Sequence, residues 1–181
     1  MSRWSASYPR LIERVLVESK RPESTVHGVH HWQLVAHTGA ELLVDVPDAD
    51  LDVVFLFGLF HDSMRENDYV DPGHGRRGGE LASRLLREMS LLEPDRLETL
   101  VHACDHHTSA RTSDDPTVGV CWDSDRLNLW RVAIEPAPRL LSTAPARKPE
   151  RIAWAEDLQE RSMSWTEICA TYERLEASRS T

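Results

Sequence analysis

The chain has 181 residues and a mass of 20.6 kDa, which fits one domain of ordinary size. Its 21 lysines and arginines stand against 30 aspartates and glutamates, a formal net charge of −9, so general nucleic-acid binding is not expected. The longest apolar run, 53–60, is too short to span a bilayer, and the first ten residues lack the apolar stretch of a signal peptide. Three cysteines without a CxxC pair fit a reducing compartment, so we expect a cytoplasmic protein without a membrane partner.

Helical periodicity dominates the sequence and no sustained period-two alternation appears, so an all-α fold is predicted. The apolar run 53–60 indicates a central helix that is buried on every side, in which Gly58 allows a neighbour to approach closely. In chain order, we expect helices over 8–20, 27–44, 51–65, 75–89, 95–107 and 117–131, and two more after a proline-containing segment that begins at 135.

Several helix starts carry recognisable capping patterns. An acidic N-cap followed by proline at the first helical position is predicted at Asp71–Pro72, Glu93–Pro94 and Asp115–Pro116. Residues 164–167 have the pattern of a capping box between the last two helices. We expect residues 1–134 to form a helical core and residues 135–181 to pack on it as part of the same single domain.

Nine histidines are the unusual feature of the composition. Helical spacing puts six polar side chains on apolar helix faces: His31, His61, Asp62, His74, His107 and Asp125. A lone inward histidine is more often a hydrogen-bonded core residue than a ligand. Six separate buried polar groups would each need a partner, whereas one or two cations satisfy them together, so a metal site is favoured. The other histidines (His27, His30, His37, His102 and His106) are interpreted as hydrogen-bonded or surface residues, and Asp105 and Asp123 as facing solvent.

The order of these residues resembles the H…HD…D pattern of the HD-domain metal-dependent phosphohydrolases. The resemblance rests on His31 with Val35 four residues later, on His61–Asp62 after an apolar helix, and on Asp125 in the segment CWDSDRL. It spans about 27–129, and HDSMREN is similar to an HDSxRxN-type subgroup. His74 and His107 resemble the additional ligands of two-metal members, and the layout is most similar to the bacterial bis(5′-nucleosyl)-tetraphosphatase (symmetrical) group.

This resemblance implies an HD-domain helical bundle that hydrolyses a phosphoester or phosphoanhydride in a small, nucleotide-like substrate by means of a metal-activated water. Two divalent transition ions are expected, from among Fe, Mn, Zn, Ni and Co. One would be held by His31, His61 and Asp125 and the other by His74 and His107, with Asp62 as the bridging, catalytic carboxylate. Three positive side chains are expected to bind the phosphate of the substrate: Arg65, Arg111 and Arg76. Arg65 is also expected to assist catalysis.

Two other functions fit the same residues. Some HD-fold proteins with a similar ligand set are di-iron oxygenases that cleave a C–C or C–P bond with O₂. A third possibility is a non-catalytic ligand-binding protein in which the metal only stabilises the fold. The sequence leaves the identity of the substrate and the oligomeric state open.

Overall fold

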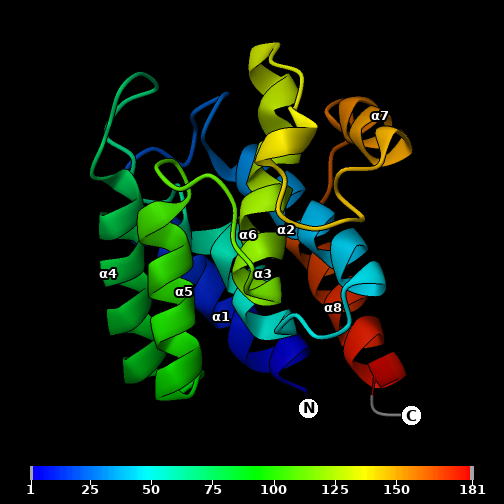
Figure 1. Cartoon of the computed structure of the whole chain (residues 1–181). Helices are drawn as coiled ribbons and strands as arrows, with labels where there is room; N and C mark the ends of the chain where they lie inside the picture. Colours follow the sequence, from blue (N-terminus) through cyan, green and yellow to red (C-terminus); the bar gives the residue numbers. More distant parts are fainter. Residues whose placement is uncertain (1, 180–181) are drawn as a thin grey trace.

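Helix α3 (Leu51–Phe60) lies at the centre of the molecule, and every one of its side chains is buried. The computed structural model describes residues 2–179. In it, α3 contacts α2 (Val29–Asp45), α5 (Pro94–His106) and α6 (Pro116–Leu127). The prediction of a central buried helix is confirmed, and so is the all-α class, because the described residues contain helices and no strand (Figure 1).

The remaining helices surround this centre. Figure 1 shows α4 (His74–Glu88) beside α5 at one edge, and α7 (Pro149–Leu158) and α8 (Trp165–Arg179) toward the other. Helix α1 (Arg3–Glu18) packs on α8, whose Ile168 and Tyr172 belong to the same hydrophobic cluster as α3. The C-terminal segment therefore contributes to the main core. No helix within residues 2–179 combines the length and the apolar character needed to cross a membrane.

Several helix ends differ from the sequence prediction. Helix α1 begins at Arg3 instead of residue 8, because Trp4 packs against the rings of Tyr8 and Phe55 and so extends the buried face. Helix α3 ends at Phe60 instead of residue 65. Helix α6 ends at Leu127, and the chain continues as two 3₁₀ turns, η1 (Asn128–Val132) and η2 (Pro138–Leu140).

Two of the predicted helix starts are formed as expected. The Asp115 side chain accepts a hydrogen bond from the Val118 N–H at 2.9 Å, with Pro116 at the first position of α6. At the start of α8, the Ser164 N–H donates to the Glu167 carboxylate at 2.8 Å and the Glu167 N–H donates back to the Ser164 hydroxyl at 3.3 Å. These reciprocal bonds form the predicted capping box.

Asp123 does not face solvent, contrary to the sequence prediction. Its side chain is fully buried and accepts hydrogen bonds from the backbone N–H groups of Ser142 and Thr143 at 2.5 and 2.7 Å, and from the Thr143 hydroxyl at 2.8 Å. Burial raises the pKa of Asp123, and these hydrogen bonds partly oppose that rise. Asp123 thus fastens the segment after η2 to α6.

A second buried carboxylate, near the start of α3, joins three helices. Asp52 of α3 accepts hydrogen bonds from the Tyr8 hydroxyl, from Arg3 of α1 and from Arg96 of α5, each at 2.6 Å. Two guanidinium groups compensate the buried charge, so this network stabilises the relative placement of the helices that carry it.

The contact between α2 and α3 depends on the absence of a side chain at Gly58. A Cβ atom there would lie 2.7 Å from the Ala36 Cβ and 2.8 Å from the Ala36 Cα. Neither atom belongs to a flexible side chain, so any larger residue would have to push the two helices apart. The close approach expected from the sequence is confirmed.

We therefore expect Gly58→Ala to lower the free energy of unfolding by about 1–3 kcal/mol, the usual cost of overpacking a core. Urea unfolding followed by circular dichroism measures the change. Gly79→Ala is the matched control, because a Cβ there comes no nearer than 3.4 Å to a neighbour, and alanine improves the helix propensity. Equal unfolding midpoints for Gly58→Ala and the unmodified chain would contradict the packing argument.

Candidate metal centre

The site begins where α3 stops. The Ser63 hydroxyl and the Ser63 N–H both donate to the Phe60 carbonyl, at 2.8 and 3.1 Å, which replaces continued helical bonding by a tight turn. His61 and Asp62 lie in this turn and are buried. The side chains of His61 and Asp62 therefore lie in the protein interior, directly after the central apolar helix.

Helix α4 begins at His74, with Gly73 at the N-cap, and the predicted Asp71–Pro72 cap is wrong. The Asp71 carboxylate instead accepts hydrogen bonds from the Glu66 N–H at 2.8 Å and from Arg77 Nη2 at 2.6 Å. Its carbonyl accepts from Nδ1 of His74 at 2.5 Å. Asp71 therefore organises the α3–α4 loop and fixes the orientation of the His74 ring.

Gly75 allows α4 to approach α5 beside the site. A Cβ at Gly75 would lie 2.1 Å from the Cys104 carbonyl oxygen and 3.1 Å from Cε1 of His107. The same Cys104 carbonyl accepts a hydrogen bond from Nδ1 of His107 at 2.7 Å. This close contact brings the rings of His74 and His107 together.

Among the described residues, three groups of three side chains lie close enough together to hold a metal ion. One of them, His27, His31 and Asp62, includes a half-buried histidine, and the other two are fully buried. The first of these two consists of His31, His61 and Asp125. The Nε2 atoms of His31 and His61 are 3.1 Å apart, and the Asp125 Oδ1 lies 3.2 Å from the His31 Nε2. These three residues come from α2, from the turn after α3 and from α6.

The second group consists of Asp62, His74 and His107, also buried. The Asp62 Oδ1 lies 3.1 Å from the His74 Nε2 and 3.7 Å from the His107 Nε2. The other oxygen of the same carboxylate, Oδ2, lies 3.6 Å from the His31 Nε2 and 3.7 Å from the His61 Nε2. Asp62 therefore stands between the two groups with one oxygen toward each.

The hydrogen bonds of three histidine rings determine which ring nitrogen carries the hydrogen and which one has a lone pair for a ligand. The Nδ1 atoms of three histidines lie within hydrogen-bond distance of backbone carbonyls, which only accept: His61 with Phe57 at 3.0 Å, His74 with Asp71 and His107 with Cys104. Each Nδ1 therefore carries the hydrogen, and in the neutral ring Nε2 is a bare lone pair. The Nε2 atoms of His74 and His107 face each other at 3.0 Å, an arrangement that needs a proton or a cation beside them.

Buried polar atoms without a hydrogen-bond partner also indicate a cation site. Among the described residues, the Oδ1 atoms of Asp62 and Asp125 are buried and accept no hydrogen bond. Orphaned carboxylate oxygens are costly in a protein interior unless a cation compensates them. The mixed nitrogen and oxygen donor set matches the ligands that divalent transition ions take in proteins. The residues present therefore fit a metal centre.

The electrostatics favour the cation-binding forms of the two buried histidines of the first group and of both carboxylates, but not that of His107. Burial lowers the pKa of His31 to about 3 and that of His61 to about 4, so both rings stay neutral. Burial alone would raise the pKa of Asp62 and of Asp125, but neighbouring histidines hold both pKa values well below the ordinary range. Burial opposes protonation of His107 as well, yet its contact with Asp62 raises the pKa of this ring overall.

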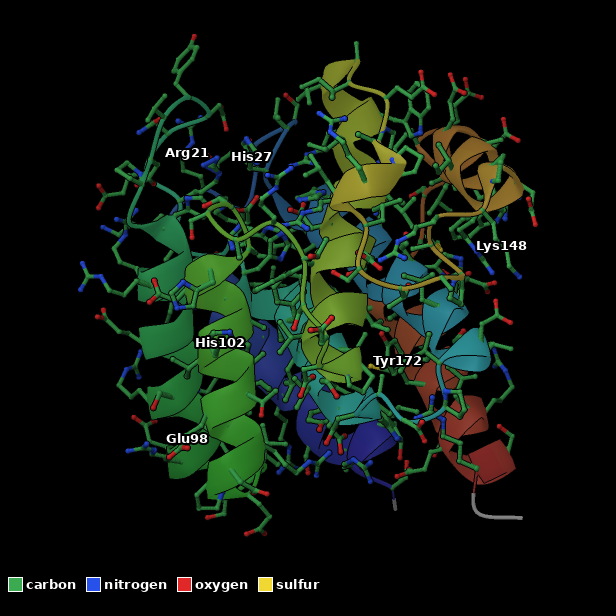
Figure 2. All side chains as sticks on the ribbon, in the orientation of Figure 1. Arg21, His27, Glu98, His102, Lys148 and Tyr172 are labelled. Carbon is green, nitrogen blue, oxygen red and sulfur yellow. The ribbon has the colours of Figure 1, made fainter. Side chains whose placement is uncertain are left out.

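His27 reaches the site, although the sequence suggested a hydrogen-bonded or surface role. Its Nδ1 lies 2.9 Å from the Asp62 Oδ2, and the side chain is 12% exposed. Figure 2 shows His27 at the loop before α2. The His27 carbonyl accepts a hydrogen bond from the Trp32 indole N–H at 2.6 Å, which holds the loop in place. The only sequence signal for His27 was its spacing of one helical turn before His31. In contrast, His102 lies on the exposed face of α5.

A cavity of about 520 Å³ opens over the two groups. Arg65 and Arg111, both predicted to bind phosphate, line it. The Arg65 Nε lies 3.5 Å from the Asp62 Oδ1, whereas Arg111 is exposed at the rim. Two apolar side chains after α6, Leu129 and Val132, also line the cavity.

Arg76 does not reach this cavity. Two positions beyond His74 on α4, its side chain points to the opposite face of the helix, is 64% exposed and pairs with Glu80 at 3.0 Å. The sequence missed two arginines of α6 and η1 that do line the cavity, Arg126 and Arg131.

Arg126 stabilises the wall of the cavity through hydrogen bonds to backbone carbonyls. Its guanidinium donates to four backbone carbonyls, those of His107, Ala110, Arg111 and Leu140. It thereby fixes the loop after α5 against η2, and both of its Nη nitrogens are engaged in these bonds.

In the metal-free protein, we expect the rings of His31 and His61 to remain neutral at about pH 5.5, where an ordinary histidine with a pKa of about 6.5 is largely protonated. Their depressed pKa values mean that protonation starts only as the pH falls toward about 4. Ring nitrogen chemical shifts measured by NMR across this pH range report the titration, with the exposed His102 ring followed in the same spectra. Titration of both buried rings near pH 6.5 would contradict the described burial.

Comparison of the chain with models of protein families, with curated proteins and with solved structures gave no match. Its function is therefore inferred from the site alone.

Proposed function

We propose that this chain is an HD-type metal-dependent phosphohydrolase that acts on a small phosphorylated substrate. The observation that carries the proposal is the pair of facing Nε2 lone pairs of His74 and His107 beside a carboxylate that also faces a second histidine group. A donor arrangement of this kind is stabilised by two cations that share Asp62.

Each side chain has a definite task in this proposal. His31, His61 and Asp125 would hold one ion, His74 and His107 the other, and Asp62 would contribute one oxygen to each. Divalent transition ions, when bound, supply a water of lowered pKa and polarise a phosphoryl oxygen. The backbone carbonyls that bind Nδ1 of three of these histidines keep the rings oriented.

The charges around the cavity support phosphoryl chemistry. Within residues 2–179, no carboxylate other than those of the proposed ligands lines the cavity, while four arginines do: Arg65, Arg111, Arg126 and Arg131. Arg65 lies closest to the shared carboxylate, with a side chain that is 11% exposed and a buried Nε that has no hydrogen-bond partner among the described residues. A guanidinium is suited to an oxyanion of the phosphate type because it presents parallel N–H donors.

A turnover screen tests the proposal against its alternatives. The metal-loaded protein is assayed on a panel of nucleoside monophosphates, dinucleoside polyphosphates, cyclic nucleotides and simple phosphomonoesters, and oxygen consumption is followed in parallel after anaerobic purification. Release of phosphate without oxygen uptake supports the hydrolase. Substrate-dependent oxygen uptake would identify an oxygenase instead, and bound metal without any turnover would favour a ligand-binding protein.

The two-ion arrangement predicts the metal content. We expect about two ions per chain in the unmodified protein and about one in His74→Ala or His107→Ala, with loss of activity, because each change removes a donor from the group that contains Asp62. Elemental analysis of dialysed protein measures the ratio, and His102→Ala is the matched control on the exposed face of α5. One ion per chain in all of these proteins would exclude the second site.

Arg65→Ala is expected to raise KM or lower kcat while the metal content stays unchanged. Loss of a charge-assisted hydrogen bond of about 1.5–3 kcal/mol corresponds to a decrease in kcat/KM of roughly 10- to 100-fold. Steady-state kinetics on the best substrate of the screen measure the decrease. Arg76→Ala is the control, because it removes the same charge outside the cavity. Unaltered kinetics in Arg65→Ala would refute a role in binding the substrate.

A further inference from the structure

We propose that Arg131 is a second oxyanion-binding residue, which together with Arg65 grips a phosphate group from the other side of the site. This inference rests on the proposed function. The sequence did not single out Arg131. The inference follows from the position that η1 gives to its side chain.

Arg131 is held rigidly at the cavity wall. Its Nε donates to the Val26 carbonyl at 3.1 Å and its Nη1 donates to the Asn128 carbonyl at 2.9 Å, so the plane of the guanidinium is fixed. The remaining nitrogen, Nη2, lies 3.7 Å from the Asp125 Oδ1, which is too long for a hydrogen bond. The side chain is 12% exposed and lines the cavity. The N–H groups of Nη2 are therefore left for a ligand.

Arg65 and Arg131 stand beside different halves of the site. The Arg65 Nε lies 3.5 Å from the Asp62 Oδ1, and its Nη1 is 3.5 Å from the His74 Nδ1, next to the second donor group. Arg131 lies next to Asp125 of the first donor group. A tetrahedral anion seated over the shared carboxylate would meet one guanidinium on each side, and its oxygens are numerous enough to accept from both.

The charge balance of the site favours an anion at this position. The two buried carboxylates, Asp62 and Asp125, are offset by the two adjoining guanidinium groups before any ion binds. Divalent cations would leave the whole assembly strongly positive in a place of low solvent access. A bound phosphate oxyanion offsets part of this positive charge, whereas a neutral substrate does not.

The experiment measures binding of inorganic phosphate to the metal-loaded protein by isothermal titration calorimetry, alongside metal analysis. In Arg131→Gln the amide can still donate to the Val26 carbonyl, but the positive charge is gone. We expect phosphate affinity to fall roughly 10- to 100-fold, with the metal content and the thermal unfolding temperature unchanged. Arg131→Lys keeps the charge but lacks the planar guanidinium, so a smaller loss of phosphate affinity is expected. It also serves as the second variant if Arg131→Gln does not fold.

Arg139→Gln is the charge-matched control, because Arg139 is exposed on η2 and does not line the cavity. An equal loss of affinity in Arg139→Gln would assign the effect to the overall field and overturn the inference. Loss of metal in both Arg131 variants would make Arg131 a support for Asp125 and also overturn it, as would unchanged phosphate affinity. If the unmodified, metal-loaded protein binds no phosphate, the proposed function itself fails, which separates the two conclusions.

Discussion

Asp62 is a buried carboxylate with imidazole nitrogens opposite both of its oxygens, and the surrounding structure can be understood from the need to compensate it. Helices α2, α4 and α5 and the turn after α3 each bring a histidine to this carboxylate, and α6 adds a second buried carboxylate, Asp125, that needs compensation as well. An apolar central helix that ends in such a residue cannot form a satisfied interior by itself. The histidines of the neighbouring helices supply part of that compensation.

The geometry of this closure is set by backbone groups more than by ring packing. The loop between α3 and α4 is ordered by Asp71, which binds Arg77 and the Glu66 N–H through its side chain and His74 through its carbonyl. Gly75 lets α4 come so near α5 that a single carbonyl, that of Cys104, borders both the glycine and the ring of His107. Backbone carbonyls thus orient the rings of His61, His74 and His107.

The all-α class, the buried α3 and the inward faces of six polar residues follow from apolar periodicity, which depends only on neighbouring positions along one helix. What periodicity does not predict is long-range contact. Asp123 was expected to face solvent because the segment that buries it, Ser142–Thr143, lies outside any periodic pattern. For the same reason His27, in an irregular loop, and Arg131, in a 3₁₀ turn, were missed. Arg76, expected to bind phosphate, lies two positions beyond His74 and therefore points to the opposite, exposed face of α4.

The wall of the cavity has an unusual origin, because Arg126 holds it through main-chain oxygens. Carbonyl groups are the same whatever the side chain, so the path of residues 108–111 does not depend on their identities. Thr108, Ser109 and Arg111 line the cavity from this loop. Their side chains are therefore free to vary without loosening the scaffold, and selectivity for the organic part of a ligand can diverge among descendants of this chain while the polar centre beneath stays constant.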